Sequence, residues 1–139
     1  MKGVHHVTFS VLASVVTGMC SGYPPAAAAE DGPIRAVVLI ESEISGMPDK
    51  LMRVLRTTYR PGATNPKHYH TSHVAFYVLE GSGIWQEEGQ PPVTLKPGDS
   101  LLVKPGTVHA HWNASTTETL TFTEFVIVDK GQRSTVRMP

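Results

Sequence analysis

Residues 65–83, NPKHYHTSHVAFYVLEGSG, place three histidines within six positions and then continue as an apolar run. In a β-strand alternate side chains share a face, so His68 and His70 are expected to point the same way, about 7 Å apart. Two imidazoles at this H-x-H spacing can reach one metal ion at about 2.0–2.1 Å. The stretch therefore predicts a strand that carries part of a metal site, and the remaining ligands have to come from elsewhere in the chain.

The sequence on both sides of this stretch is typical of short strands joined by tight turns. Branched and aromatic residues recur in runs, and Pro-Gly or Gly-Pro-rich turns separate them every 8–12 residues or so. We expect about eight strands and no helix of useful length. The expected strands lie within residues 34–44, 51–62, 74–81, 82–88, 100–106, 107–115 and 119–128, and one more carries His68 and His70. Residues 46–50 are expected to turn the chain, and the tail after 128 has no strong pattern. The fold class is therefore all-β, as a sandwich or barrel.

Charge and length narrow the class of partner. The chain has 139 residues, with 12 basic and 12 acidic side chains and a formal net charge of zero. One domain of this length is the ordinary expectation. A balanced and dispersed charge gives no electrostatic footprint for nucleic acid or for an anionic membrane, so a small molecule is the expected partner.

The first 29 residues have the layout of a secretory signal peptide. Lys2 precedes an apolar segment, residues 7–20, which is too short to span a bilayer, and Ala27-Ala28-Ala29 provides an A-x-A cleavage site. The alternatives are a buried N-terminal helix or, less well matched, a lipoprotein modified at Cys20. On the first interpretation residues 30–139 form the mature domain, which is periplasmic or secreted and has no membrane contact after signal removal.

Cysteine usage limits the chemistry of the mature domain. Cys20 is the only cysteine and lies in the predicted signal. A disulfide, a thiol nucleophile and a thiolate ligand are therefore all excluded from residues 30–139. Any metal site has to be built from histidine, carboxylate and backbone groups.

A second motif some 40 residues later completes the pattern. The first motif consists of Gly62, five further residues, His68-x-His70 and, later, Gly81. The second motif consists of Gly98, five further residues, Lys104-Pro105-Gly106, two residues, His109, three residues and Asn113. Together these residues resemble the paired motifs of the cupin superfamily. The resemblance implies a double-stranded β-helix, a jelly-roll-like barrel in which His68, His70 and His109 converge on one metal ion.

The departures from the cupin pattern bear on chemistry. The first motif normally supplies a glutamate ligand, and that position is Val74 here; Lys104 replaces a proline in a turn. An ion held by three neutral imidazoles keeps its +2 charge and favours anionic ligands. Three-histidine cupins resemble Fe(II) dioxygenases, so the resemblance implies oxidation of a small organic anion, with Fe first and Mn, Ni, Cu or Zn as other ions. A metal-dependent lyase or isomerase, and a non-catalytic binding protein for a small ligand or metal, are the alternatives.

Three further polar residues have open roles. His73 becomes a metal ligand if the turn at residues 71–72 shifts the register, and otherwise lies at the barrel rim. His111 shares the inward parity of His109, and either acts as catalytic acid or base at neutral pH or fills the barrel. We expect Glu124 to be a solvated charge outside the barrel, although an inward Glu124 would supply the missing carboxylate.

The parity of the strands also predicts the pocket walls. Most inward positions are apolar, so the substrate is expected to be small and partly hydrophobic. Trp85 and Tyr77 are expected outside the barrel or at a contact between two copies, because a small barrel with exposed strand edges favours a homodimer. The positions of inward parity are Val54 or Leu55, Thr58 or Tyr59, Phe76, Val78, Phe122, Glu124 and Val126.

Overall fold

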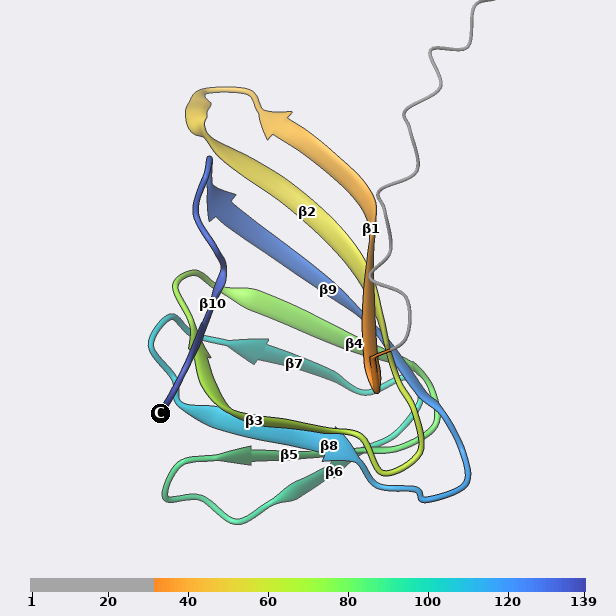
Figure 1. The fold of residues 1–139 in the computed structure, drawn as a ribbon. Helices are drawn as coiled ribbons and strands as arrows, with labels where there is room; N and C mark the ends of the chain where they lie inside the picture. The colour runs from red at the N-terminus through yellow and green to blue at the C-terminus, as the bar shows by residue number, and fades with distance from the viewer. Residues whose placement is uncertain (1–31) are drawn as a thin grey trace, which may run out of the picture.

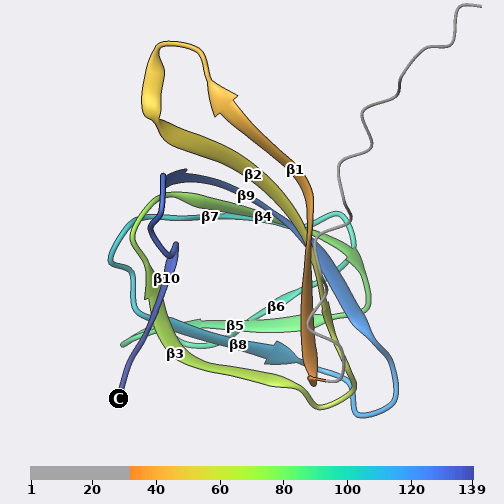
Figure 2. The ribbon, with the colours of Figure 1, turned by 45° about the horizontal axis from the view of Figure 1, so that its top comes forward.

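The computed structural model describes residues 32–139, and this part of the chain is built entirely of antiparallel strands and turns (Figure 1). One sheet has the strand order β1-β2-β9-β4-β7 and the other the order β10-β3-β8-β5-β6. Figure 2 shows the two sheets facing each other across the interior, as in a double-stranded β-helix. The strands are β1 (Ile34–Ile44), β2 (Met47–Tyr59), β3 (Thr64–His70), β4 (Val74–Glu80), β5 (Gly83–Glu87), β6 (Val93–Leu95), β7 (Ser100–Val103), β8 (His109–Asn113), β9 (Leu120–Asp129) and β10 (Thr135–Arg137).

The predicted fold class is confirmed, and the strands differ from expectation at two places. β2 begins at Met47, inside the segment expected to turn, and the tail contributes β10 against β3. The proposed signal peptide lies outside the described residues. Within the described residues, no helix is long and apolar enough to cross a bilayer.

Strand alternation places the core between the sheets. Val74, Phe76 and Val78 of β4 are 1%, 6% and 4% exposed, whereas Tyr77 between them is exposed. Burial of these side chains, at about 25 cal/mol per Å² of apolar surface, drives closure of the barrel. Leu120, Phe122, Val126 and Val128 of β9 and Tyr59 of β2 complete this core with Trp85 and Val103.

Trp85 is a correction, because it lies inside the barrel and only 5% of its surface is exposed. Its strand, β5, pairs with β8 so that Trp85 lies opposite His111 and Gly83 opposite Asn113. His111 and Asn113 face inward, and residues directly opposite each other on paired strands point to the same side of the sheet, so Trp85 also faces inward. The sequence interpretation placed Trp85 outside the barrel or at a contact between two copies, whereas the strand register places it inside.

Backbone contacts close the end of the barrel near the β8–β9 loop. Asn113 is 3% exposed, and its Nδ2 lies 2.7 Å from the Glu118 carbonyl and 3.1 Å from the Arg60 carbonyl. Gly81, with φ at 73°, packs against the backbone of Thr119. These contacts tie the ends of β2, β4 and β8 to the loop that leads into β9.

Candidate metal centre

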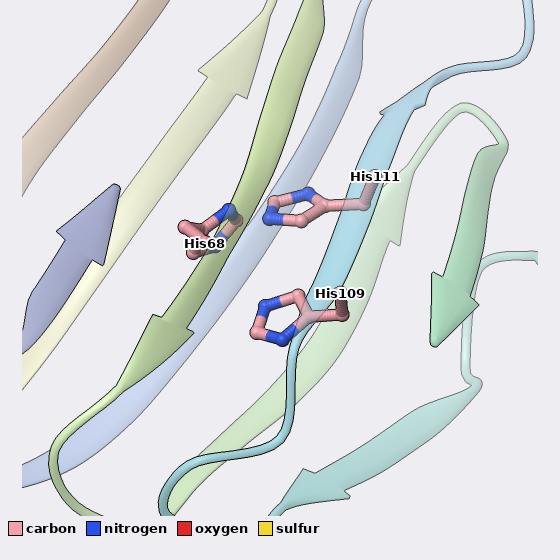
Figure 3. A group of neighbouring side chains, drawn as sticks. All are labelled: His68, His109 and His111. Carbon is pink, nitrogen blue, oxygen red and sulfur yellow. The ribbon is translucent and has the colours of Figure 1, made fainter. Parts of the chain in front are cut away.

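Two neighbouring strands bring four histidines, the histidine cluster, to one place inside the barrel. His68 and His70 lie on β3 and His109 and His111 on β8, and they are 1%, 3%, 0% and 8% exposed. The cluster forms because β3 and β8 pair with His68 opposite His109. Figure 3 shows His68, His109 and His111, whose rings approach one another from these two strands.

Ring distances show how tight the cluster is. The centroids of the His68 and His109 rings are 4.2 Å apart. The His70 ring lies 5.2 Å from that of His68 and 5.1 Å from that of His109. The predicted ligands His68, His70 and His109 therefore lie together.

The hydrogen bonds fix the tautomers of two of these rings. His68 Nδ1 lies 2.8 Å from the Pro66 carbonyl oxygen, and His109 Nδ1 lies 2.8 Å from the Thr107 carbonyl oxygen. A carbonyl oxygen only accepts, so each Nδ1 carries the proton and donates it. Each Nε2 is then left with a lone pair, which is the form that binds a metal ion.

The Nε2 atoms of His68, His70 and His109 are buried and have no hydrogen-bond partner. A buried polar atom without a partner costs about 1–3 kcal/mol, so three together are hard to explain in a site without a ligand. A divalent transition metal ion would satisfy all three lone pairs. The donor set therefore fits such an ion.

His111 competes with His70 for the third position. The candidate ligating atoms of His68, His109 and His111 all lie within 4.8 Å of one another, and His70 is not in this group. However, His111 Nε2 lies 3.3 Å from Asn65 Nδ2, an amide nitrogen, which can only donate. We favour His70, because its Nε2 has no partner, whereas that of His111 already accepts from Asn65.

Burial keeps the cluster neutral. Removal from water disfavours the imidazolium, and this lowers the pKa of His70 and of His109 to about 4 and also lowers the pKa of His68. Neighbouring cluster imidazoles lower the pKa of His70 and His109 further. All three rings are therefore neutral imidazoles at pH 7, as metal binding requires.

His73 is not brought to the cluster. It is exposed in the turn before β4, whereas its neighbour Val74 is 1% exposed and points into the core. The register at residues 71–72 does not shift, because Val74 pairs with Val103 and Val126 as strict alternation requires. The structure thus places His73 at the rim, and an apolar residue occupies the position of the usual glutamate.

Glu124 is a second correction, because its side chain faces the interior. A cavity of about 190 Å³ adjoins the cluster, and Glu124 lines it together with His68 and His111. Glu124 Oε1 accepts a hydrogen bond of 2.6 Å from the Thr57 hydroxyl. The rest of the wall is formed by Ile34, Ala36, Leu55, Thr57, Tyr59, Asn65, His70, Phe76, Ser134 and Thr135.

Aromatic rings hold the β8 histidines in place. Trp85 stacks on His109 with centroids 4.1 Å apart and planes at 21°, and Tyr59 stacks on His111 at 5.4 Å and 26°. Such contacts restrict the ring orientations and exclude water from one side of the cluster. Trp85 had been expected outside the barrel, so sequence reasoning missed its contact with the site.

The two ligand sets make different predictions for metal content. If His68, His70 and His109 hold the ion, His70→Ala lowers the affinity for a divalent ion by more than about 100-fold, since it removes a direct ligand. His111→Ala then keeps one ion per chain and loses most turnover. His73→Ala is the matched control and keeps the full metal content, which elemental analysis of untagged protein measures. Metal loss in His111→Ala with retention in His70→Ala would reverse the assignment.

Comparisons with known proteins agree with this architecture. The sequence profile of the family described as "Cupin domain" matches residues 55–133, more than half of the chain. The (R)-mandelonitrile lyase of Granulicella tundricola is 37% identical over 60 residues, which are 43% of this chain and 46% of the lyase. The chain thus matches less than half the length of that relative.

Solved structures of low identity share the fold. A cupin-like protein from Thermotoga maritima has a TM-score of 0.60 at 23% identity, covering 79% of this chain and 88% of its own. The Bacillus subtilis oxalate decarboxylase, a protein with Mn(II) centres, has a TM-score of 0.60 at 20% identity, covering 78% of this chain and 29% of its own. At these identities the likeness shows the fold alone.

Proposed function

Since the chain belongs to the cupin family and its histidine cluster fits a divalent metal ion, we propose that it is a metal-dependent lyase for a small hydroxylated organic compound. The observation that carries this proposal is the set of three buried, unpartnered Nε2 atoms beside a cavity that is also lined by a carboxyl group. The similarity to a mandelonitrile lyase supports the choice of reaction type.

The chain's own residues define the setting of the reaction. His68, His70 and His109 would hold the ion, which supplies a Lewis acid for a substrate oxygen. Phe76, Tyr59 and the other apolar wall residues exclude water and fit a small, partly apolar molecule. Asn65 holds the His111 ring against this cavity, so that His111 contacts the substrate rather than the bulk solvent.

A direct test uses racemic mandelonitrile as the probe. We expect protein loaded with Mn(II) or Fe(II) to release benzaldehyde, seen by its ultraviolet absorbance, with no oxygen uptake at the electrode. Metal-free protein and His109→Ala loaded in the same way should show only the background rate. Absence of benzaldehyde release above background with both ions would contradict the lyase proposal.

A second candidate function is Fe(II)-dependent dioxygenation. It is favoured by one observation: the ligating group found among the described residues contains imidazoles and no carboxylate. An ion there keeps its full charge and favours an anionic organic ligand. Oxygen uptake by the Fe(II)-loaded protein with a small diketone anion, such as acetylacetonate, would favour this function over the lyase.

A further inference from the structure

The carboxyl group of Glu124 is the polar feature of the cavity that the metal centre does not use. Strand register brings it inside, since Glu124 lies opposite Phe76 of β4 and opposite Leu55 of β2. Phe76 is buried, and Leu55 lines the same cavity. The inward position of Glu124 is therefore set by two neighbouring strands and not by a flexible loop.

This carboxyl group lacks a cationic partner. The four ion pairs found in residues 32–139 join Lys50 to Asp129, Arg53 to Glu41, Lys67 to Glu88 and Lys130 to Glu43. Burial without a partner raises the pKa of Glu124, and only the Thr57 hydroxyl bond opposes this. A half-buried carboxyl group without an ion pair is costly and is typical of functional sites.

Glu124 belongs to neither of the two candidate ligand sets. The group of ligating atoms within 4.8 Å of one another consists of histidines and does not include a Glu124 oxygen. Yet Glu124, His68 and His70 line one cavity. The space between the carboxyl group and the imidazoles is thus available to a small molecule that contacts both.

We propose that Glu124 is the residue that binds the substrate's hydroxyl group and takes its proton, with a small, neutral 2-hydroxy compound as the substrate class. Thr57 acts as a positioning residue, because its bond to Oε1 orients the carboxylate toward the cavity. This inference rests on the proposed lyase function for the reaction and on the cavity alone for the binding.

The proton balance of the step is simple. The substrate O–H bond breaks and its proton goes to the Glu124 carboxylate, while the oxygen's electron pair forms a C=O bond. The bond between the hydroxyl-bearing carbon and the leaving group breaks, and its electrons depart with that group. Glu124 then gives the proton to the leaving group, so the residue is restored and nothing is oxidised or reduced.

The binding part is tested with two matched probes, 2-hydroxyacetophenone and acetophenone, which differ by one hydroxyl group. Their dissociation constants are measured on Co(II)-loaded protein from changes in its visible absorption. We expect the wild type to bind the hydroxylated probe about tenfold more tightly, as a hydrogen bond to a charged group allows. Glu124→Leu should abolish this preference, whereas Glu124→Gln, which still accepts a hydrogen bond, should keep part of it.

The proton-transfer part is tested on mandelonitrile turnover. Glu124→Gln should lower kcat about 100-fold or more and leave KM within a few fold, since the amide binds the hydroxyl group but cannot take its proton. Asp129→Asn, the same exchange at an exposed position of β9, should match the wild type. Far-ultraviolet circular dichroism and metal content are measured for every variant. If Glu124→Leu does not fold, the result for Glu124→Gln alone tests the role of Glu124.

The outcomes separate this inference from the lyase proposal. Three outcomes would overturn the role of Glu124. The preference for the hydroxylated probe persists in Glu124→Leu, neither probe binds to the wild type, or Glu124→Gln loses the metal ion. If the wild type prefers the hydroxylated probe, Glu124→Leu loses this preference and the wild type does not cleave mandelonitrile, the lyase function is overturned. Glu124 is then supported as the binding residue.

Discussion

Replacing His109 with alanine is expected to abolish stoichiometric metal binding and the activity that depends on it. His109 is fully buried and belongs to both candidate ligand sets, so its loss weakens binding whichever histidine is the third ligand. Removal of a direct ligand should lower the affinity by more than about 100-fold, because loss of a mere supporting contact already costs 10–100-fold. Elemental analysis after dialysis measures this.

The stacking of Trp85 on His109 gives a second readout. Cu(II) bound at the cluster should quench the fluorescence of Trp85, and Trp85→Phe should lose the quenching while it retains the ion. If His109→Ala retains both the metal ion and the quenching, the ion is bound elsewhere and the assignment of the centre fails.

Replacing Gly81 with alanine is expected to cause the largest loss of stability. A Cβ at this position would lie 2.3 Å from the Thr119 carbonyl oxygen, and the residue also has a positive φ of 73°. Neither side of this contact can move easily, because both are backbone. We expect a loss of about 4 kcal/mol or more in the free energy of unfolding, which in urea titration appears as a large fall in the midpoint.

The matched control for this variant is Gly89→Ala. Gly89 has a φ of 76°, but nothing lies within 4 Å of the added Cβ. Gly89→Ala should therefore lower the free energy of unfolding only by the strain of a non-glycine residue in the left-handed region, about 1 kcal/mol. Equal losses in the two variants would mean that the contact between Gly81 and Thr119 contributes little to the closure of the barrel.

Much of the site follows from strand alternation in the sequence. The spacing of His68 and His70 requires a shared face, and the same rule places His109 and His111 together. The structure agrees, because each of these positions is buried and the residues between them are less so. What alternation cannot supply is the pairing between strands, which decides that His68 lies opposite His109.

The errors at Glu124 and Trp85 share one cause. In both cases residue type was given more weight than parity: a glutamate was assigned to solvent and a tryptophan to the surface. Glu124 alternates with the buried Phe122 and Val126 on β9, so parity placed it inside correctly. A half-buried carboxyl group that faces the interior is the kind of local conflict between propensity and fold that marks a functional position.

The tail was missed for a different reason. β10 has only three residues, too few for a periodic pattern to be recognised, and its pairing with β3 is a long-range contact. Its Thr135 hydroxyl lies 3.3 Å from His70 Nδ1, so a segment without a sequence signal supports a candidate ligand.

The hydrogen bonds from His68 and His109 to backbone carbonyl oxygens are local, so this part of the centre can be transferred to another protein. Each ring is held by a carbonyl oxygen only two residues earlier in the chain, that of Pro66 for His68 and that of Thr107 for His109. Part of the orientation of each imidazole is thus set within a tripeptide, and the stacking of Trp85 adds to it at His109. Two such tripeptides grafted onto adjacent antiparallel strands of an unrelated sheet, with the histidines opposite each other, should reproduce two of the three protein ligands.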